Sequence, residues 1–150
     1  MANESVVLQE IMSQPEVWAA TWRRLQESRD RLSSLIFSQC WDAVFFAGCG
    51  STYYLSQAAA NLYQQVTGQR THALPSSESA FFPRGVYPDI IGQQVLLIAV
   101  SRSGETSETI WAVEQQRERQ LPVLTVTCRA NSPLARLSNA VLAVEEADEV

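Results

Sequence analysis

The 150-residue sequence has room for one domain of ordinary size, and its 46% apolar and 18% charged residues are typical of a globular protein. Sixteen acidic and 11 basic residues give a net charge of -5, which argues against a nucleic-acid-binding protein because such proteins concentrate positive charge. Every basic residue is an arginine, so the chain has no lysine for a Schiff base or a general base. His72 is the single histidine, and the sequence predicts no metal and no cofactor.

The sequence carries no sign of secretion or membrane insertion. No basic and apolar N-terminal stretch resembles a signal peptide, and no apolar run approaches the ~20 residues that cross a bilayer. Three cysteines without CxxC spacing favour a cytoplasmic protein with reduced, mostly buried thiols: Cys40, Cys49 and Cys128. One acidic cluster near the end is expected to be a solvated segment: Glu145, Glu146, Asp148 and Glu149.

A long helix is expected over Pro15–Phe37. Ser13 or Gln14 can cap it, and proline suits the first helical turn. One apolar stripe recurs at helical spacing, formed by Trp18, Trp22, Leu25, Leu32 and Ile36. We expect this stripe to pack on the domain or on a second subunit, and we expect a homodimer. Residues 1–40 therefore form an N-terminal helical segment, and residues 41–150 form the domain.

Beyond residue 41, short apolar runs alternate with helical segments. Strands are expected at Ala43–Ala47, Thr71–Leu74, Gln94–Val100, Pro122–Cys128 and Ala140–Val144. Helices are expected at Thr52–Thr67, ended by Gly68, at Ser76–Phe82, after Thr106 to Arg119, and after the Ser132 cap with its following Pro133. The first of these helices has one apolar face: Leu55, Ala58, Ala59, Leu62 and Val66. Five strands with right-handed helical crossovers predict a three-layer α/β/α domain with a parallel, doubly wound, flavodoxin-like sheet, preceded by the long helix.

Two glycine- and hydroxyl-containing loops follow the first and third strands. If the strand order is 2-1-3-4-5, the order reverses between these strands, where ligands bind in such sheets. The loops are Gly48–Thr52 and Ser101–Thr106, and each opens a helix whose N–H groups and dipole favour an anion such as phosphate. Plain helix-capping turns, at Ser51 and at Ser103, are the structural alternatives.

Several enzyme classes do not fit these loops. The chain has no GK[ST] sequence, which argues against nucleoside triphosphate hydrolysis, and no full GxGxxG motif with an acidic partner. Ser51 lacks GxSxG flanks and a downstream histidine, so a serine hydrolase is disfavoured. Cys49 at a helix N-terminus is interpreted as a small buried thiol, since no base partner is evident.

The segment VLLIAVSRSGETSET, Val95–Thr109, resembles the signature of the sugar isomerase (SIS) domain family. The resemblance includes AGCGST at Ala47–Thr52 and TVTCRANSPLARLSNAVLAVEE at Thr125–Glu146, and covers about residues 41–150. The chain is most similar to the first SIS half of glucosamine-fructose-6-phosphate aminotransferases, and to tagatose-6-phosphate ketose/aldose isomerase-like and fructosamine-6-phosphate deglycase-like proteins. Because such relatives continue into a second half, we expect a truncated chain whose activity needs another half.

The resemblance implies roles for particular residues. The loop after the third strand would bind the sugar phosphate through hydroxyls of Ser101, Ser103 and Thr106 and the backbone of Arg102 and Gly104. Two further segments would contact the sugar: Gly50, Ser51 and Thr52, and the turn containing Ala130 and Ser132. A family glutamate near the crevice matches Glu78, which could equally be structural.

The resemblance also implies a reaction class. The family interconverts aldose and ketose phosphates, in some members with amine transfer or release, through an enediol-like intermediate that a carboxylate base serves. The catalytic residues of two-half relatives match nothing in this chain, and the in-chain candidates are Glu78, His72 and Glu105. The sequence thus predicts binding of a sugar phosphate such as fructose-6-phosphate or glucosamine-6-phosphate, with isomerisation or deamination/deglycation when a second half is present. The alternatives are a non-catalytic phosphosugar-sensing module and a scaffold subunit.

Overall fold

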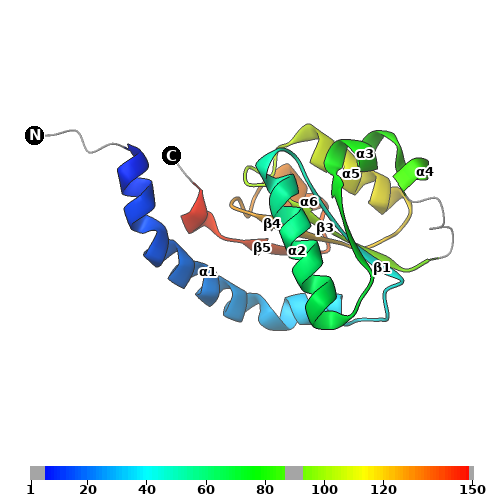
Figure 1. Cartoon of the computed structure of the whole chain (residues 1–150), viewed down its shortest axis with the longest axis horizontal. Coiled ribbons are helices and arrows are strands. Elements are labelled where there is room, and N and C mark those ends of the chain that lie inside the picture. Colours follow the sequence, from blue (N-terminus) through cyan, green and yellow to red (C-terminus); the bar gives the residue numbers. More distant parts are fainter. Residues whose placement is uncertain (1–5, 87–92, 149–150) are drawn as a thin grey trace, which may run out of the picture.

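A parallel five-stranded sheet forms the centre of the molecule in the computed structural model, which describes residues 6–86 and 93–148 (Figure 1). The strand order is β2-β1-β3-β4-β5, as predicted, and every neighbouring pair is parallel. The strands are β1 (Ala43–Gly48), β2 (Thr71–Pro75), β3 (Val95–Val100), β4 (Val123–Thr127) and β5 (Ala140–Ala143).

Helices cover both faces of this sheet, which confirms the three-layer α/β/α prediction (Figure 1). One face carries α2 (Ser51–Thr67) and the C-terminal end of α1 (Val6–Ile36). The other carries α5 (Ser107–Glu118) and α6 (Pro133–Leu137), with α3 (Ser76–Phe81) packed against α5. Two short helices complete the described chain, α4 (Pro83–Val86) and the 3-10 helix η1 (Glu145–Ala147). Within the described ranges, no helix has the length and apolarity that crossing a membrane requires.

The two central strands are buried along their whole length. All residues of β1 and β3 are buried, and their side chains alternate between the two core clusters. Phe45 and Leu97 belong to the cluster under α5 and α6, whereas Phe46 and Ile98 belong to the cluster under α1 and α2. A strand covered on both faces needs apolar side chains at every position, which explains the uninterrupted apolar run of β3.

Helix α1 begins earlier than the sequence pattern predicts. It starts at Val6 rather than at Pro15, and the proline lies inside the helix. Proline has no N–H to donate to the carbonyl of Ile11, which is why the pattern favoured a helix start there. The helix nevertheless continues through Pro15, with Ile11 one turn and Val7 two turns before it, on the side of Trp18.

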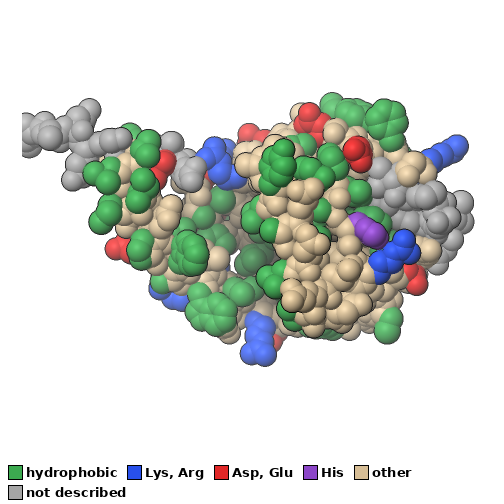
Figure 2. Space-filling view, in the orientation of Figure 1, with side chains coloured by type: hydrophobic (Ala, Val, Ile, Leu, Met, Phe, Trp, Pro, Cys, Tyr) green, Lys and Arg blue, Asp and Glu red, His purple; other side chains and the backbone are tan. Residues whose placement is uncertain are grey.

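The apolar stripe of α1 divides into a packed part and an exposed part. Leu32 is buried against the sheet and Ile36 packs beside it, whereas Trp18 and Trp22 remain 75% and 62% exposed. Figure 1 shows the N-terminal half of α1 extending away from the sheet, and Figure 2 shows hydrophobic side chains gathered over it. The prediction that the stripe packs on the domain is therefore wrong for Trp18 and Trp22. Their packing on a second subunit stays a prediction.

The helix α2 packs on the sheet mainly through small side chains and Tyr63, and of the predicted apolar face Ala59 packs inward. Ser56 and Ala60 are buried, whereas the larger Leu55, Leu62 and Val66 are 59%, 61% and 75% exposed. Small residues let the helix backbone approach the sheet closely, and the larger apolar side chains then point outward. Gly68 ends the helix in the left-handed conformation, with φ +70° and its N–H bonded to the Gln64 carbonyl, as predicted.

Gln116 is a polar side chain of α5 that is buried and has no hydrogen-bond partner among the residues the structure describes. It is 1% exposed, and neither side-chain amide atom has a hydrogen-bond partner among the described residues. We expect Gln116→Met to raise the free energy of unfolding by about 1 kcal/mol, because a buried unpaired amide is costly and methionine has a similar volume. Calorimetry should show Tm rising by about 3 °C. The exposed Gln65→Met is the control, and a lower Tm for Gln116→Met than for the wild type would contradict this account.

The exposed tryptophans of α1 provide a test of the predicted dimer. We expect Trp18→Ala/Trp22→Ala to convert a dimer into a monomer in analytical ultracentrifugation, with little change in helix content by circular dichroism. The reason is that side chains this exposed stabilise a single chain only weakly, so their loss acts mainly on an intermolecular contact. Phe82→Ala, at an exposed aromatic residue outside α1, is the matched control. A monomeric wild-type chain, or a double variant that stays dimeric, would refute the prediction.

Candidate functional site

The two hydroxyl-containing loops lie side by side at the carboxyl edge of the sheet. The strands that precede them, β1 and β3, are neighbours, and Ala47 pairs with Ala99 near the ends of both strands. This is the point at which the strand order reverses, as predicted. Chain segments about 50 residues apart in sequence are thereby brought to one place, as the alternation of strands and crossover helices requires.

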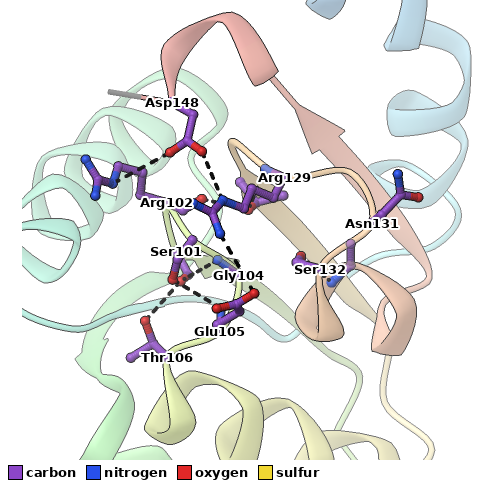
Figure 3. Close-up of polar contacts among 12 residues, drawn as sticks. Ser101, Arg102, Gly104, Glu105, Thr106, Arg129, Asn131, Ser132 and Asp148 are labelled. Atoms are coloured by element: carbon purple, nitrogen blue, oxygen red, sulfur yellow. Dashed lines mark hydrogen bonds and ion pairs between the residues drawn. The ribbon is translucent and has the colours of Figure 1, made fainter. Parts of the chain in front are cut away.

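The loop Ser101–Thr106 holds its hydroxyls through its own backbone (Figure 3). The buried Ser101 Oγ accepts a hydrogen bond from the Gly104 N–H at 3.1 Å and lies 3.1 Å from Thr106 Oγ1. Ser103 Oγ accepts from the Glu105 N–H at 3.2 Å. Ser103 Oγ accepts and keeps its own O–H for an acceptor beyond the loop, whereas Ser101 and Thr106 share one hydrogen bond, so one O–H of that pair is used within the loop and the other can donate outward.

Strand β4 anchors this loop from the neighbouring position in the sheet. The Ser101 N–H donates to the Val126 carbonyl at 3.1 Å. The carbonyl of Arg102 accepts from the Cys128 N–H at 3.0 Å and from Thr127 Oγ1 at 3.1 Å. The first two residues of the loop are thus tied to the end of β4 and to Cys128, which fixes the start of the loop.

Gly104 is required in the loop for two independent reasons. Its φ of +63° lies in the left-handed region that side-chain-bearing residues rarely adopt, and a Cβ there would overlap the Ser132 side chain. Its carbonyl accepts from the Leu134 N–H at 3.1 Å, which joins the loop to the start of α6. A backbone this close to a second helix leaves room for glycine alone.

The loop after β1 has a different internal arrangement. Thr52 Oγ1 accepts from the Cys49 N–H at 3.0 Å and donates to the Cys49 carbonyl at 2.9 Å, so this hydroxyl closes the turn. Gly48 has no room for a Cβ beside Thr52, whereas Gly50 has open space and a φ of +57°. Ser51 is exposed at the first position of α2. Of the predicted sugar-contacting residues, Gly50 and Ser51 therefore face outward and Thr52 faces into its own loop.

The N-terminus of α5 points its first N–H groups toward the same edge. Thr106 is the N-cap, and the first intrahelical bond runs from the Ile110 N–H to the Thr106 carbonyl at 3.0 Å. The preceding N–H groups have no acceptor within the helix, and the helix dipole adds partial positive charge there. The capping alternative at Ser103 does not hold, since Thr106 occupies the N-cap position, without a side-chain hydrogen bond to the helix.

A buried hydroxyl contact joins the elements around this edge. Thr109 Oγ1 donates to Ser76 Oγ at 3.0 Å and lies 3.9 Å from the Cys49 sulfur. Cys49 is half-buried, in partial agreement with the prediction of a small buried thiol, as is Cys128, whereas Cys40 is exposed. All three are free thiols.

The three acid/base candidates lie at different places. Glu105 belongs to the β3 loop, and Glu78 lies in the first turn of α3, directly after the carboxyl end of β2. His72 pairs in register with Phe45, stacks on its ring and accepts a hydrogen bond from Arg70 Nε at 3.2 Å. Since β2 runs on to Pro75, this places His72 about 10 Å short of the strand end. The structure therefore brings Glu105 and Glu78 to the loop edge, and leaves His72 away from it.

The turn after β4 places its two predicted residues differently. Ser132 is buried and caps α6, its Oγ accepting from the Ala135 N–H at 3.2 Å, as the Ser-Pro pattern predicted. Its hydroxyl oxygen is thus already engaged within the fold. Ala130 is exposed beside it. A hollow of about 350 Å³ runs along this turn and is lined by Glu105, Cys128, Arg129, Ala130, Asn131, Ser132, Glu145 and Asp148.

Sequence reasoning missed an ion-pair network at this hollow (Figure 3). Arg129 Nε donates to Asp148 Oδ2 at 2.9 Å, and this bond raises the pKa of the guanidinium above its ordinary value. Asp148 belongs to the acidic cluster expected to be solvated, and that expectation is wrong for it, since its side chain is 25% exposed and ion-paired. Glu146 also pairs, with Arg24 of α1 at 2.9 Å, while Glu149 lies outside the described residues. The sequence feature that could have indicated this network is the position of Arg129 just after β4, the strand beside β3, where ligand-binding residues lie in such sheets.

Metal binding finds no support in the part of the chain described. Residues 6–86 and 93–148 contain no group of three His, Cys, Asp or Glu side chains that could hold a metal ion.

The close approach at Gly104 predicts unequal effects for two glycine substitutions. We expect Gly50→Ala to cost about 1 kcal/mol of unfolding free energy, from its positive φ alone. Gly104→Ala should cost about 3 kcal/mol, because overlap with Ser132 adds to a similar φ penalty. Urea denaturation of both variants measures the difference. Equal losses would show that the contact with Ser132 does not constrain the loop.

The sequence and the fold were compared with known proteins. A family description, the SIS domain, matches residues 38–150. The chain is 30% identical over 145 residues to a glutamine–fructose-6-phosphate aminotransferase [isomerizing] of Pyrobaculum aerophilum, covering 96% of this chain and 23% of that protein. The chain thus spans about a quarter of the length of this relative.

Two solved structures show the same architecture. Tagatose-6-phosphate ketose/aldose isomerase from Escherichia coli superposes with a TM-score of 0.84 and 21% identity, over 97% of this chain and 42% of that chain. Glucosamine-6-phosphate deaminase from Thermotoga maritima gives a TM-score of 0.63 and 27% identity, over 84% of this chain and 40% of that chain. Together with the match over residues 38–150, these similarities show that the chain belongs to the SIS domain family.

Proposed function

We propose that this chain binds the phosphate of a sugar phosphate in the loop Ser101–Thr106, as the phosphosugar-binding part of an isomerase-type enzyme. The observation that carries the proposal is the convergence of three hydroxyls and the N-terminus of α5 on one loop at the switch point of the sheet. In this proposal residues 41–150 form the phosphosugar-binding domain and residues 1–40 its N-terminal helical segment.

Neutral donors are sufficient to hold a phosphate at such a loop. A phosphate offers three acceptor oxygens, and O–H donors of Ser101, Ser103 and Thr106 would meet them together with N–H groups of α5. The serine oxygens accept from the Gly104 and Glu105 N–H groups, and a hydroxyl that accepts a hydrogen bond can still donate its own proton. No lysine is needed for this mode of binding.

The loop after β1 would hold the sugar rather than the phosphate. Gly50 and Ser51 are exposed beside the β3 loop, so the Ser51 hydroxyl can reach a sugar hydroxyl. Thr52 bonds in both directions to Cys49, so its role would be to keep this loop in shape. Ser132 would act similarly, by holding α6 against Gly104, while Ala130 would leave space for the sugar.

The names of the similar proteins narrow the substrate class. They refer to fructose-6-phosphate, tagatose-6-phosphate and glucosamine-6-phosphate, which are hexose 6-phosphates or an amino derivative. We therefore propose a hexose 6-phosphate or a 2-amino-hexose 6-phosphate as the ligand. The reaction would move a proton between neighbouring carbons through an enediol-like intermediate, with a carboxylate as the base and a second SIS half completing the site.

Isothermal titration calorimetry with fructose-6-phosphate and glucosamine-6-phosphate tests the proposed binding. We expect Ser101→Ala/Ser103→Ala to weaken affinity about 100-fold, since two hydrogen bonds to a charged group together contribute about 3 kcal/mol. Ser34→Ala, an exposed serine of α1 that bonds only to the Arg31 carbonyl, is the matched control.

Two outcomes of this experiment would contradict the proposal. Unchanged affinity in the double variant would show that the phosphate is not held by this loop, and no binding by the wild-type chain would refute phosphosugar binding. Binding without turnover, in an NMR assay of this chain supplied with a second SIS half, would favour the sensing module over the enzyme.

A further inference from the structure

Two arginines at the edge of the phosphate-binding loop share one carboxylate. Arg129 Nε lies 2.9 Å from Asp148 Oδ2, and Arg102 Nε lies 4.0 Å from Asp148 Oδ1. Figure 3 shows Asp148 between the two guanidinium groups, above Ser101 and Gly104. Arg129 Nη1 also lies 3.8 Å from Glu105 Oε1, so the guanidinium group already contacts a residue of the loop.

These arginines are placed to neutralise the charge of a phosphate that the loop binds through its hydroxyl and N–H groups. A phosphate monoester carries a charge of about -1.5 to -2 at pH 7, and the hydroxyl and N–H donors of the loop leave that charge unneutralised. A guanidinium bonds phosphate through a planar fork of donors and keeps its charge at every physiological pH. Arg129 is paired with Glu105 of the loop, so its guanidinium lies close to an anion bound there, and Arg102 belongs to the loop through its backbone.

We propose that Arg129 is a specificity-determining residue of this site, and that Asp148 competes with the ligand's phosphate for its guanidinium. The proposal rests on the proposed function, since it adds to phosphate binding by the same loop. Asp148 thereby lowers affinity for weak or singly charged anions, and a dianionic phosphate held by the hydroxyls displaces it. Arg102, at the longer distance from Asp148, follows Arg129 as a secondary partner.

The ion pairs of Asp148 are exposed to solvent, so replacing its carboxylate with a phosphate costs little free energy. The side chains of Arg129 and Arg102 are 50% and 54% exposed, and that of Asp148 is 25% exposed. Ion pairs so accessible to water are weak, because water screens them and ordering long side chains opposes them. A phosphate that is already fixed by the loop can therefore replace the carboxylate without a large penalty.

The alternative role for Asp148 is to orient Arg129 for binding. The two roles predict opposite effects for removal of the carboxylate charge. If Asp148 competes, Asp148→Asn frees the guanidinium and tightens anion binding. If Asp148 orients the guanidinium, the same substitution loosens it and weakens anion binding. The sign of the change decides between them.

The experiment is a calorimetric titration of the 150-residue chain with inorganic phosphate and with fructose-6-phosphate. We expect Asp148→Asn to tighten binding about fourfold and Arg129→Gln to weaken it about tenfold. Arg129→Lys should retain part of the affinity, since charge remains while the fork of donors is lost. In the Arg129→Gln background, Asp148→Asn should have little effect, because the guanidinium for which Asp148 and the phosphate compete is gone. Glu114→Gln, an exposed charge removal in α5, is the matched control.

The outcomes separate this inference from the proposed function. Weaker binding by Asp148→Asn, or unchanged binding by Arg129→Gln, overturns the inference while loss of affinity in Ser101→Ala/Ser103→Ala still supports the phosphate loop. Absence of phosphate binding by the wild-type chain overturns both. Thermal denaturation by circular dichroism verifies that each variant is folded before its affinity is compared.

Discussion

The contact between the Gly104 backbone and Ser132 determines the shape of the candidate site. The Gly104 N–H holds Ser101 Oγ, and its carbonyl receives the Leu134 N–H at the start of α6. The same serine that packs against Gly104 caps α6 through the Ala135 N–H. One residue without a side chain thus couples the hydroxyl loop, the β4 turn and α6, and a larger residue would separate all three.

The buried sheet makes this arrangement rigid enough to present donors in fixed directions. Strands β1 and β3 are covered on both faces, so their ends cannot shift relative to one another without disturbing both core clusters. The absence of lysine from the sequence is consistent with such a site, because rigid hydroxyls and helix N–H groups bind anions without a flexible cation. Arginines then occupy the rim, where their charge can be regulated by carboxylates.

Local patterns were sufficient to predict the strands, their order and the two loops. Uniformly apolar runs such as Val95–Val100 are typical of covered parallel strands, and glycine with hydroxyls after them indicates a ligand edge. Other features depend on packing that no local pattern shows. The outward face of α2 follows from the close approach allowed by Ser56 and Ala60, and the distance of His72 from the loops follows from its register with Phe45. The pairing of Arg129 with Asp148, 19 residues later, required the path of β5 and η1.

The length of a hexose 6-phosphate separates the binding role from the catalytic role at this site. In the proposed complex, the phosphate on carbon 6 lies against Ser101 and Ser103, whereas the proton transfers occur at carbons 1 and 2, at the other end of the sugar. Glu105 belongs to the phosphate loop itself, since its N–H bonds Ser103 Oγ, and its carboxylate faces Arg129. It is therefore badly placed to act as the base for carbons 1 and 2. Glu78, which follows β2 on the other side of β1, is better separated from the phosphate, so within this chain the geometry favours it over Glu105 for work at the reacting carbons.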